Sequence, residues 1–266
     1  MKTKFNNTKL YFCAAAALTL LTTVLRSLAL VLATDTNGYL TASHPLTVLL
    51  YISAGIALAF LLFFPLILKG SFSAAGRDVQ TRGTVIGAGL CCFAYLLNFV
   101  VACPLIGTLG IPALLWLLGI LALPIGAAYF GTKLPLFKTP TVKTRAILGC
   151  VALFALACLI CFTYFDIATP MNAPRKTHLH LALLSLLLYL LYELRAVVGI
   201  PMPRAHAAFS ALGFYLSCSL GLSGIVGFAA GLYRTPLYFC QDILLLCFAV
   251  YIAANTALLA AADKER

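Results

Sequence analysis

The chain has 266 residues, of which 63% are hydrophobic and only 9% are charged, and its formal net charge is +11. Seven acidic and 18 basic residues cannot cover the surface of a soluble domain of this size, so the composition excludes a water-soluble globular fold. A mean hydropathy of +1.04 indicates a protein that crosses a membrane several times.

Eight apolar stretches are long enough to cross the hydrocarbon core of a bilayer, which takes about 20 helical residues. Their apolar runs are continuous and rich in Leu and Ala, whereas the strands of a membrane barrel alternate apolar and polar residues. We predict an all-α polytopic helical bundle that forms a single transmembrane domain over residues 1–266. Its predicted spans cover about 10–33, 45–68, 84–104, 111–131, 146–164, 178–200, 207–229 and 238–262.

The first apolar stretch follows a basic segment, residues 1–9, and therefore has the outline of a secretory signal peptide. The apolar part of a signal peptide is only about 7–15 residues long, whereas this stretch continues past Arg26 to Ala33. We expect an uncleaved first helix. Its removal would leave seven spans.

The basic residues fall mainly in alternate connections between the spans. Thirteen Lys and Arg residues, Lys133 among them, lie in segments that an internal N-terminus would place in the cytoplasm. Only three lie in the external loops, at Arg175, Lys176 and Arg234. Because Lys and Arg in short loops favour the cytoplasmic side, we predict a multi-pass protein of the cell membrane with both termini cytoplasmic. The same pattern explains the positive net charge, so we do not expect the protein to bind nucleic acid. The expected partner of the basic loops is the lipid bilayer.

Small residues mark the seventh stretch as a helix that packs closely. Glycine recurs there at spacings of three, four and eight, at Gly213, Gly221, Gly224, Gly227 and Gly231. A ridge of small residues lets helix backbones approach in lipid, so we predict a central, tightly packed helix rather than a pore-lining one. On this interpretation Gly224→Leu disrupts the fold, and Gly231→Leu is milder.

Three charged residues lie within predicted spans and away from the span ends, where a charge is costly and often functional: Arg26, Glu193 and Arg195. Glu193 and Arg195 point to opposite sides of their helix, and Arg195 is within reach of the cytoplasmic headgroups. We therefore expect Glu193 to face the bundle interior, and Glu193→Gln to leave folding nearly intact. Arg26 and Glu193 are predicted at different depths in the bilayer, so we do not expect them to pair. Arg26 is expected to extend outward, or to bind backbone carbonyls or an acid such as Asp35.

Acids and histidines also gather near the predicted external helix ends, at Asp35, Asp166, Asp242, His44, His178 and His180. Their spacing is poor for shared ligation, so we predict neither a metal site nor a cofactor. Eight of the ten cysteines fall within spans, as small apolar residues. Cys103 and Cys240 both lie near the external, oxidising side, so the sequence allows a disulfide between them but does not show that their helices are neighbours.

Two segments carry a resemblance to other proteins. The sequence TPMNAPRK at 169–176, followed by YLLYELR at 189–195, resembles multi-pass membrane proteins of anaerobic Gram-positive bacteria, and so does the loop from Asp35 to Tyr39. That group has no assigned activity, so the resemblance implies a bacterial plasma membrane and transfers no role to any residue.

The sequence supports two hypotheses of function. Motifs of soluble enzymes are missing, including a phosphate-binding loop, H-E-x-x-H and G-x-S-x-G, so an enzyme is not expected. The first hypothesis is a small-solute transporter or permease component in which Glu193 lies near a polar path. The alternative is a membrane sensor, scaffold or accessory subunit, which would meet a second copy or another membrane protein.

Overall fold

The computed structural model describes residues 7–34, 40–67, 81–105, 110–135, 140–167, 173–232 and 235–262. These residues form eight long helices and no extended strand beyond a single bridge pair, and the eight helices are all long and apolar enough to span a membrane. This confirms the predicted all-α polytopic bundle. The helices are α1 (Asn7–Leu32), α2 (Pro45–Ile67), α3 (Arg82–Ala102), α4 (Ala113–Gly131), α5 (Val142–Phe165), α6 (Pro174–Val197), α7 (Pro203–Ala229) and α8 (Pro236–Ala262), with a short 3₁₀ turn, η1 (Cys103–Leu105), after α3.

Local sequence signals set where several helices begin. Thr81 and Thr141 accept hydrogen bonds from backbone N–H groups in the first turns of α3 and α5, which are ordinary N-caps. Helices α6 and α7 begin at proline, which is favoured in the first turn because its missing N–H would have no helical partner there. Both helices therefore start four residues before the predicted spans.

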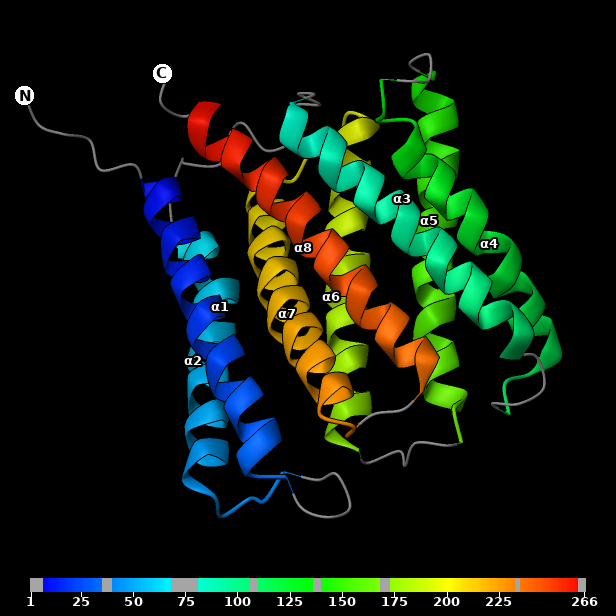
Figure 1. The fold of residues 1–266 in the computed structure, drawn as a ribbon. Helices are drawn as coiled ribbons and strands as arrows, with labels where there is room; N and C mark the ends of the chain where they lie inside the picture. The colour runs from blue at the N-terminus through cyan, green and yellow to red at the C-terminus, as the bar shows by residue number, and fades with distance from the viewer. Residues whose placement is uncertain are drawn as a thin grey trace, which may run out of the picture.

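The six helices from α3 to α8 form a closed ring. Each packs against the next in chain order, and α8 packs against α3 to close the ring, so that α3 and α8 run side by side in Figure 1. Helices α1 and α2 form a pair outside this ring, where both contact α7. Only 22% of the α2 span is buried, against 61% for α7 and 67% for α8, so the pair is peripheral and α7 and α8 are central.

The first turn of α1 and the last turn of α8 lie at the same end of the bundle, at the top of Figure 1. We call this the inner end, following the predicted topology, and the opposite end the outer end. An even number of spans agrees with two termini on one side. That this side is the cytoplasm remains a prediction from the charge distribution.

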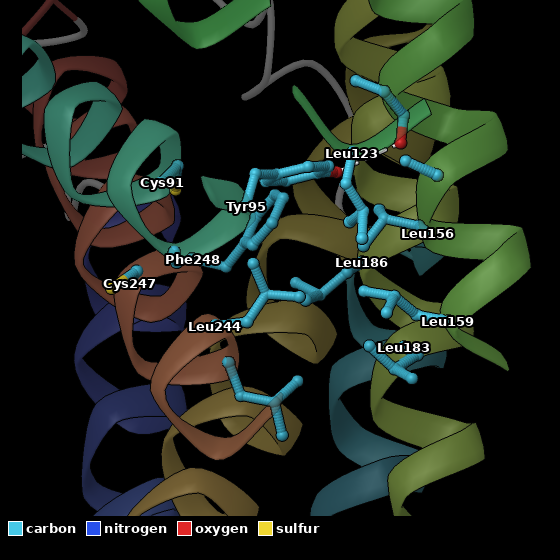
Figure 2. Close-up of a cluster of buried hydrophobic side chains, with 14 of the residues drawn as sticks. Cys91, Tyr95, Leu123, Leu156, Leu159, Leu183, Leu186, Leu244, Cys247 and Phe248 are labelled. Carbon is cyan, nitrogen blue, oxygen red and sulfur yellow. Dashed lines mark hydrogen bonds between the residues drawn. The ribbon is translucent and has the colours of Figure 1, made fainter. Parts of the chain in front are cut away.

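The interior of the ring is filled with apolar side chains at its middle depth. Tyr95, Leu123, Leu186, Leu244 and Phe248 belong to one buried cluster that joins α3, α4, α6 and α8, and Figure 2 shows them converging between the helices. The hydroxyl of Tyr95 donates a hydrogen bond to the Ala152 carbonyl at 3.1 Å. This central apolar layer separates the two ends of the ring.

The glycines of α7 lie against α8. A Cβ atom at Gly221 would come within 3.0 Å of the Asp242 carbonyl, and one at Gly224 would overlap the Asp242 carboxylate. Gly227 is buried on the same helix. Gly231 differs, because it follows the helix end with a φ of 74° and has nothing within 4 Å of its Cβ position. Its glycine suits a left-handed turn rather than close packing.

Candidate functional site

A group of polar side chains lies inside the ring at the inner end. It draws on α4, α6, α7 and α8 together with the turn that follows α4. We call it the inner polar cluster, and its members are Tyr129, Lys133, Tyr189, Glu193, His206, Tyr251 and Asn255.

Glu193 is the centre of the inner polar cluster. It lies in the last turns of α6, and only 8% of its surface is exposed. Its Oε1 atom accepts hydrogen bonds from the hydroxyl of Tyr129 at 2.9 Å and from that of Tyr251 at 2.6 Å. The same oxygen accepts from the ammonium of Lys133, which forms an ion pair with it. Three donors therefore converge on one carboxylate oxygen.

Lys133 reaches this carboxylate from the turn two residues beyond α4. Its Nζ atom lies 5.2 Å from the ring centroid of Tyr129 and 5.1 Å from that of Tyr251. It also donates a hydrogen bond to the Tyr251 hydroxyl. Cations within about 6 Å of an aromatic centroid are attracted by the negative face of the ring. A carboxylate, a phenol oxygen and two aromatic rings thus surround the ammonium.

Two polar groups beside this ion pair have no hydrogen-bond partner among the described residues. One is the Oε2 atom of Glu193, and the other is the imidazole of His206, whose two nitrogens are both buried. The His206 ring lies 5.6 Å from the ring of Tyr189, which precedes Glu193 by one turn of α6. Leaving such groups unpaired costs about 1–3 kcal/mol each, so the cluster holds hydrogen-bonding capacity that the described residues do not use.

Of the intramembrane residues singled out from the sequence, Glu193 and Arg195 lie on different faces of α6. Arg195 is half-buried in the last turn of the helix, where a positive charge favours the C-terminal end of the helix dipole. The sequence did not identify Lys133, Tyr129 or Tyr251 as neighbours of Glu193. Lys133 had been assigned to a cytoplasmic loop, as one of several topology-setting charges.

Arg26 does not extend outward, contrary to the expectation from its depth. It is buried, its Nε atom donates to the Ser223 hydroxyl at 2.9 Å, and its Nη1 atom donates to Nδ1 of His178 at 3.0 Å. Asp35, the acid suggested as its partner, lies outside the described residues.

A second buried ion pair lies at the outer end. Arg175 and Lys176, expected in an external loop, occupy the first turn of α6 and are buried. Arg175 donates to Oδ2 of Asp242, an acid that the sequence predicts near an external helix end and that is only 1% exposed. We call the group formed by Arg175, Asp242, Arg26, His178 and Ser223 the outer polar cluster. Gly224 leaves the space that the Asp242 carboxylate occupies.

Three of the other residues predicted near the external helix ends have hydrogen-bond partners in the structure. Asp166 accepts from the Tyr238 hydroxyl at 2.6 Å, His44 accepts from the backbone N–H of Leu46 at 3.3 Å, and His180 donates to the Ile160 carbonyl at 3.2 Å. Within the described part of the chain, no three His, Cys, Asp or Glu residues gather as metal ligands. The thiols of Cys103 and Cys240 are both free.

Comparison of the chain with models of protein families, with curated proteins and with solved structures finds no match.

Proposed function

We propose that the protein is a small-solute transporter of the cell membrane, in which the α3–α8 ring encloses the path and the inner polar cluster binds the solute. The observation that carries this proposal is the buried Glu193–Lys133 pair inside a ring of spanning helices. Ionisable groups at membrane depth are costly, and where they persist they commonly mark a solute or ion pathway.

The arrangement along the ring supports the same proposal. Along α6 the order is Arg175, then the leucines of the central apolar layer, then Glu193, and along α8 it is Asp242, Leu244, Phe248 and Tyr251. Polar clusters at both ends are thus separated by an apolar layer. A transporter that exposes its site to one side at a time needs such a barrier, and side chains can supply it without a continuous pore.

The test is uptake by the purified protein in liposomes. Proteoliposomes are incubated with a mixture of amines, amino acids, sugars and carboxylates, and the lumenal contents are measured by mass spectrometry. At least one solute should enter faster than in protein-free liposomes, and the double variant Lys133→Met/Glu193→Gln should abolish that uptake. Arg195→Lys, two residues away on another face of α6, is the matched control and should keep it.

The double variant leaves no unpaired charge in the cluster, so its loss of uptake would not follow from misfolding. A single symmetric peak in size-exclusion chromatography verifies this. If no solute of the mixture enters, or if the double variant transports like the wild type, the proposal is wrong. The accessory-subunit or sensor hypothesis then takes its place.

A further inference from the structure

We infer that the inner polar cluster is a binding site for an organic ammonium group, and that the side chain of Lys133 occupies the ammonium position in this structure. The inference rests on the proposed function, since it names the class of solute. It adds that Lys133 is an internal occupant of the site, which a solute must displace.

The surroundings of Nζ are those that recognise a cation in general. Glu193 supplies the negative charge, Tyr251 supplies both a hydroxyl and a ring, and Tyr129 supplies a second ring at 5.2 Å. Recognition of ammonium ligands by aromatic rings relies on the same combination of negative charge and ring faces. Nothing in this set requires that the cation be attached to the chain.

The walls of the site are held in place by contacts that do not involve Lys133. Tyr129 and Tyr251 are both fully buried. The Tyr251 ring meets the Phe130 ring edge-on at 5.4 Å, and the Phe130 ring packs in the same way against Phe248 of the central apolar layer. Glu193 is fixed by the hydroxyls of both tyrosines. The site is therefore preorganised, which reduces the entropy lost when a ligand binds.

The occupant, in contrast, is attached by a flexible stem. Lys133 lies outside the regular part of α4, in a turn that begins at Thr132, and its four methylene groups let the ammonium withdraw with little movement of the backbone. A ligand with one positive charge replaces Lys133 without changing the charge beside Glu193. This exchange avoids the cost of an unpaired carboxylate inside the bundle.

His206 provides an independent indication that a ligand belongs here. It is 8% exposed, neither of its ring nitrogens has a partner among the described residues, and its ring lies 5.6 Å from that of Tyr189, one turn before Glu193 on α6. Together with Oε2 of Glu193 it offers acceptors and a donor beside the ammonium position. A ligand with a second polar group next to its ammonium would satisfy both.

Chemical rescue tests the inference directly. Lys133→Ala removes the ammonium and leaves a space that n-propylammonium matches atom for atom. The variant should melt at a lower temperature than the wild type, and n-propylammonium at millimolar concentration should restore at least half of that difference. n-Propanol, which has the same shape without the charge, should restore none. Lys143→Ala, which changes an exposed lysine on α5, should neither lower the melting temperature nor respond.

The double variant Lys133→Ala/Glu193→Gln separates recognition from a general effect of amines, and it should not be rescued. If Lys133→Ala does not fold, Lys133→Met keeps the stem up to the Cε position and leaves only the Nζ position free, and ammonium ion should then bind in a saturable manner in calorimetry. Equal rescue by n-propanol overturns the inference. So does the absence of a response to ammonium in whichever Lys133 variant folds.

These results are distinguishable from those on transport. Rescue without uptake of any solute would leave the ammonium site standing and remove the transport proposal. Uptake of a solute that has no ammonium group, without rescue, would do the reverse.

Discussion

Breaking the Lys133–Glu193 pair should destabilise the bundle far more when one partner is removed than when both are. The two perturbations are Lys133→Met and Glu193→Gln, made singly and together. In the single variants the remaining charged group stays inside the ring, since the side chains of Lys133 and Glu193 are only 13% and 11% exposed. In the double variant neither charge is left.

The magnitude follows from the burial of the pair. Removing one member of a buried pair costs about 3–5 kcal/mol, most of it from the charge left unpaired, and replacing both members by neutral groups is often close to neutral. We expect each single variant near the lower end of that range, because a small part of each side chain reaches solvent. The double variant should lose less than either single variant, which gives a coupling energy of at least about 3 kcal/mol.

From the sequence alone, Glu193→Gln was expected to leave folding nearly intact, because no partner of Glu193 had been identified. The ion pair changes that expectation. Reversible unfolding in mixed micelles, followed by tryptophan fluorescence or by steric trapping, measures the four free energies of the cycle. Single variants within about 0.5 kcal/mol of the wild type, or a double variant whose loss is the sum of both, would refute the reasoning.

Three further predictions concern packing and topology. Gly224→Ala should lower the free energy of unfolding by about 3 kcal/mol or more, because its Cβ overlaps a buried carboxylate. Gly231→Ala, at a positive φ, should lower it by about 1–2 kcal/mol. Chemical unfolding measures both losses, and a larger loss for Gly231→Ala would contradict the prediction. In a cysteine-free background, Ala42→Cys should react with an impermeant maleimide added outside and Lys143→Cys only after permeabilisation; the opposite pattern would invert the topology. Arg26→Gln should lower stability by about 1.5–3 kcal/mol through loss of its charged hydrogen bonds, and unchanged thermal unfolding would mean that they contribute nothing.

The fold could be predicted because a bilayer imposes length and hydrophobicity on every spanning helix. The largest errors lay where charged residues belong to a helix. Arg175 and Lys176 were placed in a loop, since a charge usually ends a span, yet Pro174 before them is a strong helix-start signal. Their side chains are accommodated by acceptors on neighbouring helices, such as the Asp242 carboxylate and the Asp166 carbonyl. A single sequence does not reveal those neighbours.

The candidate site was predicted only at its centre. Glu193 attracts attention because a carboxylate in a span is rare. Lys133 does not, because a lysine in a short loop already has an explanation in topology. Tyr129 and Tyr251 are two of 12 tyrosines, and nothing distinguishes them until α4, α6 and α8 are brought together. Residues whose role depends on helix arrangement were thus the ones missed.

The two buried ion pairs set a physical condition on any movement of the ring. The Lys133–Glu193 pair joins the turn after α4 to α6, and Lys133 also donates a hydrogen bond to Tyr251 of α8. The Arg175–Asp242 pair joins α6 to α8 at the outer end. Withdrawing Lys133 alone to open the inner end would leave Glu193 unpaired, at a cost of about 3–5 kcal/mol. The population of the open state would then be lower by roughly 10²- to 4 × 10³-fold. An ammonium ligand bound to Glu193 supplies the missing charge and removes that penalty. In the proposed transporter, ligand binding and opening of the inner end are therefore coupled through one carboxylate, while the Arg175–Asp242 pair keeps the outer end closed.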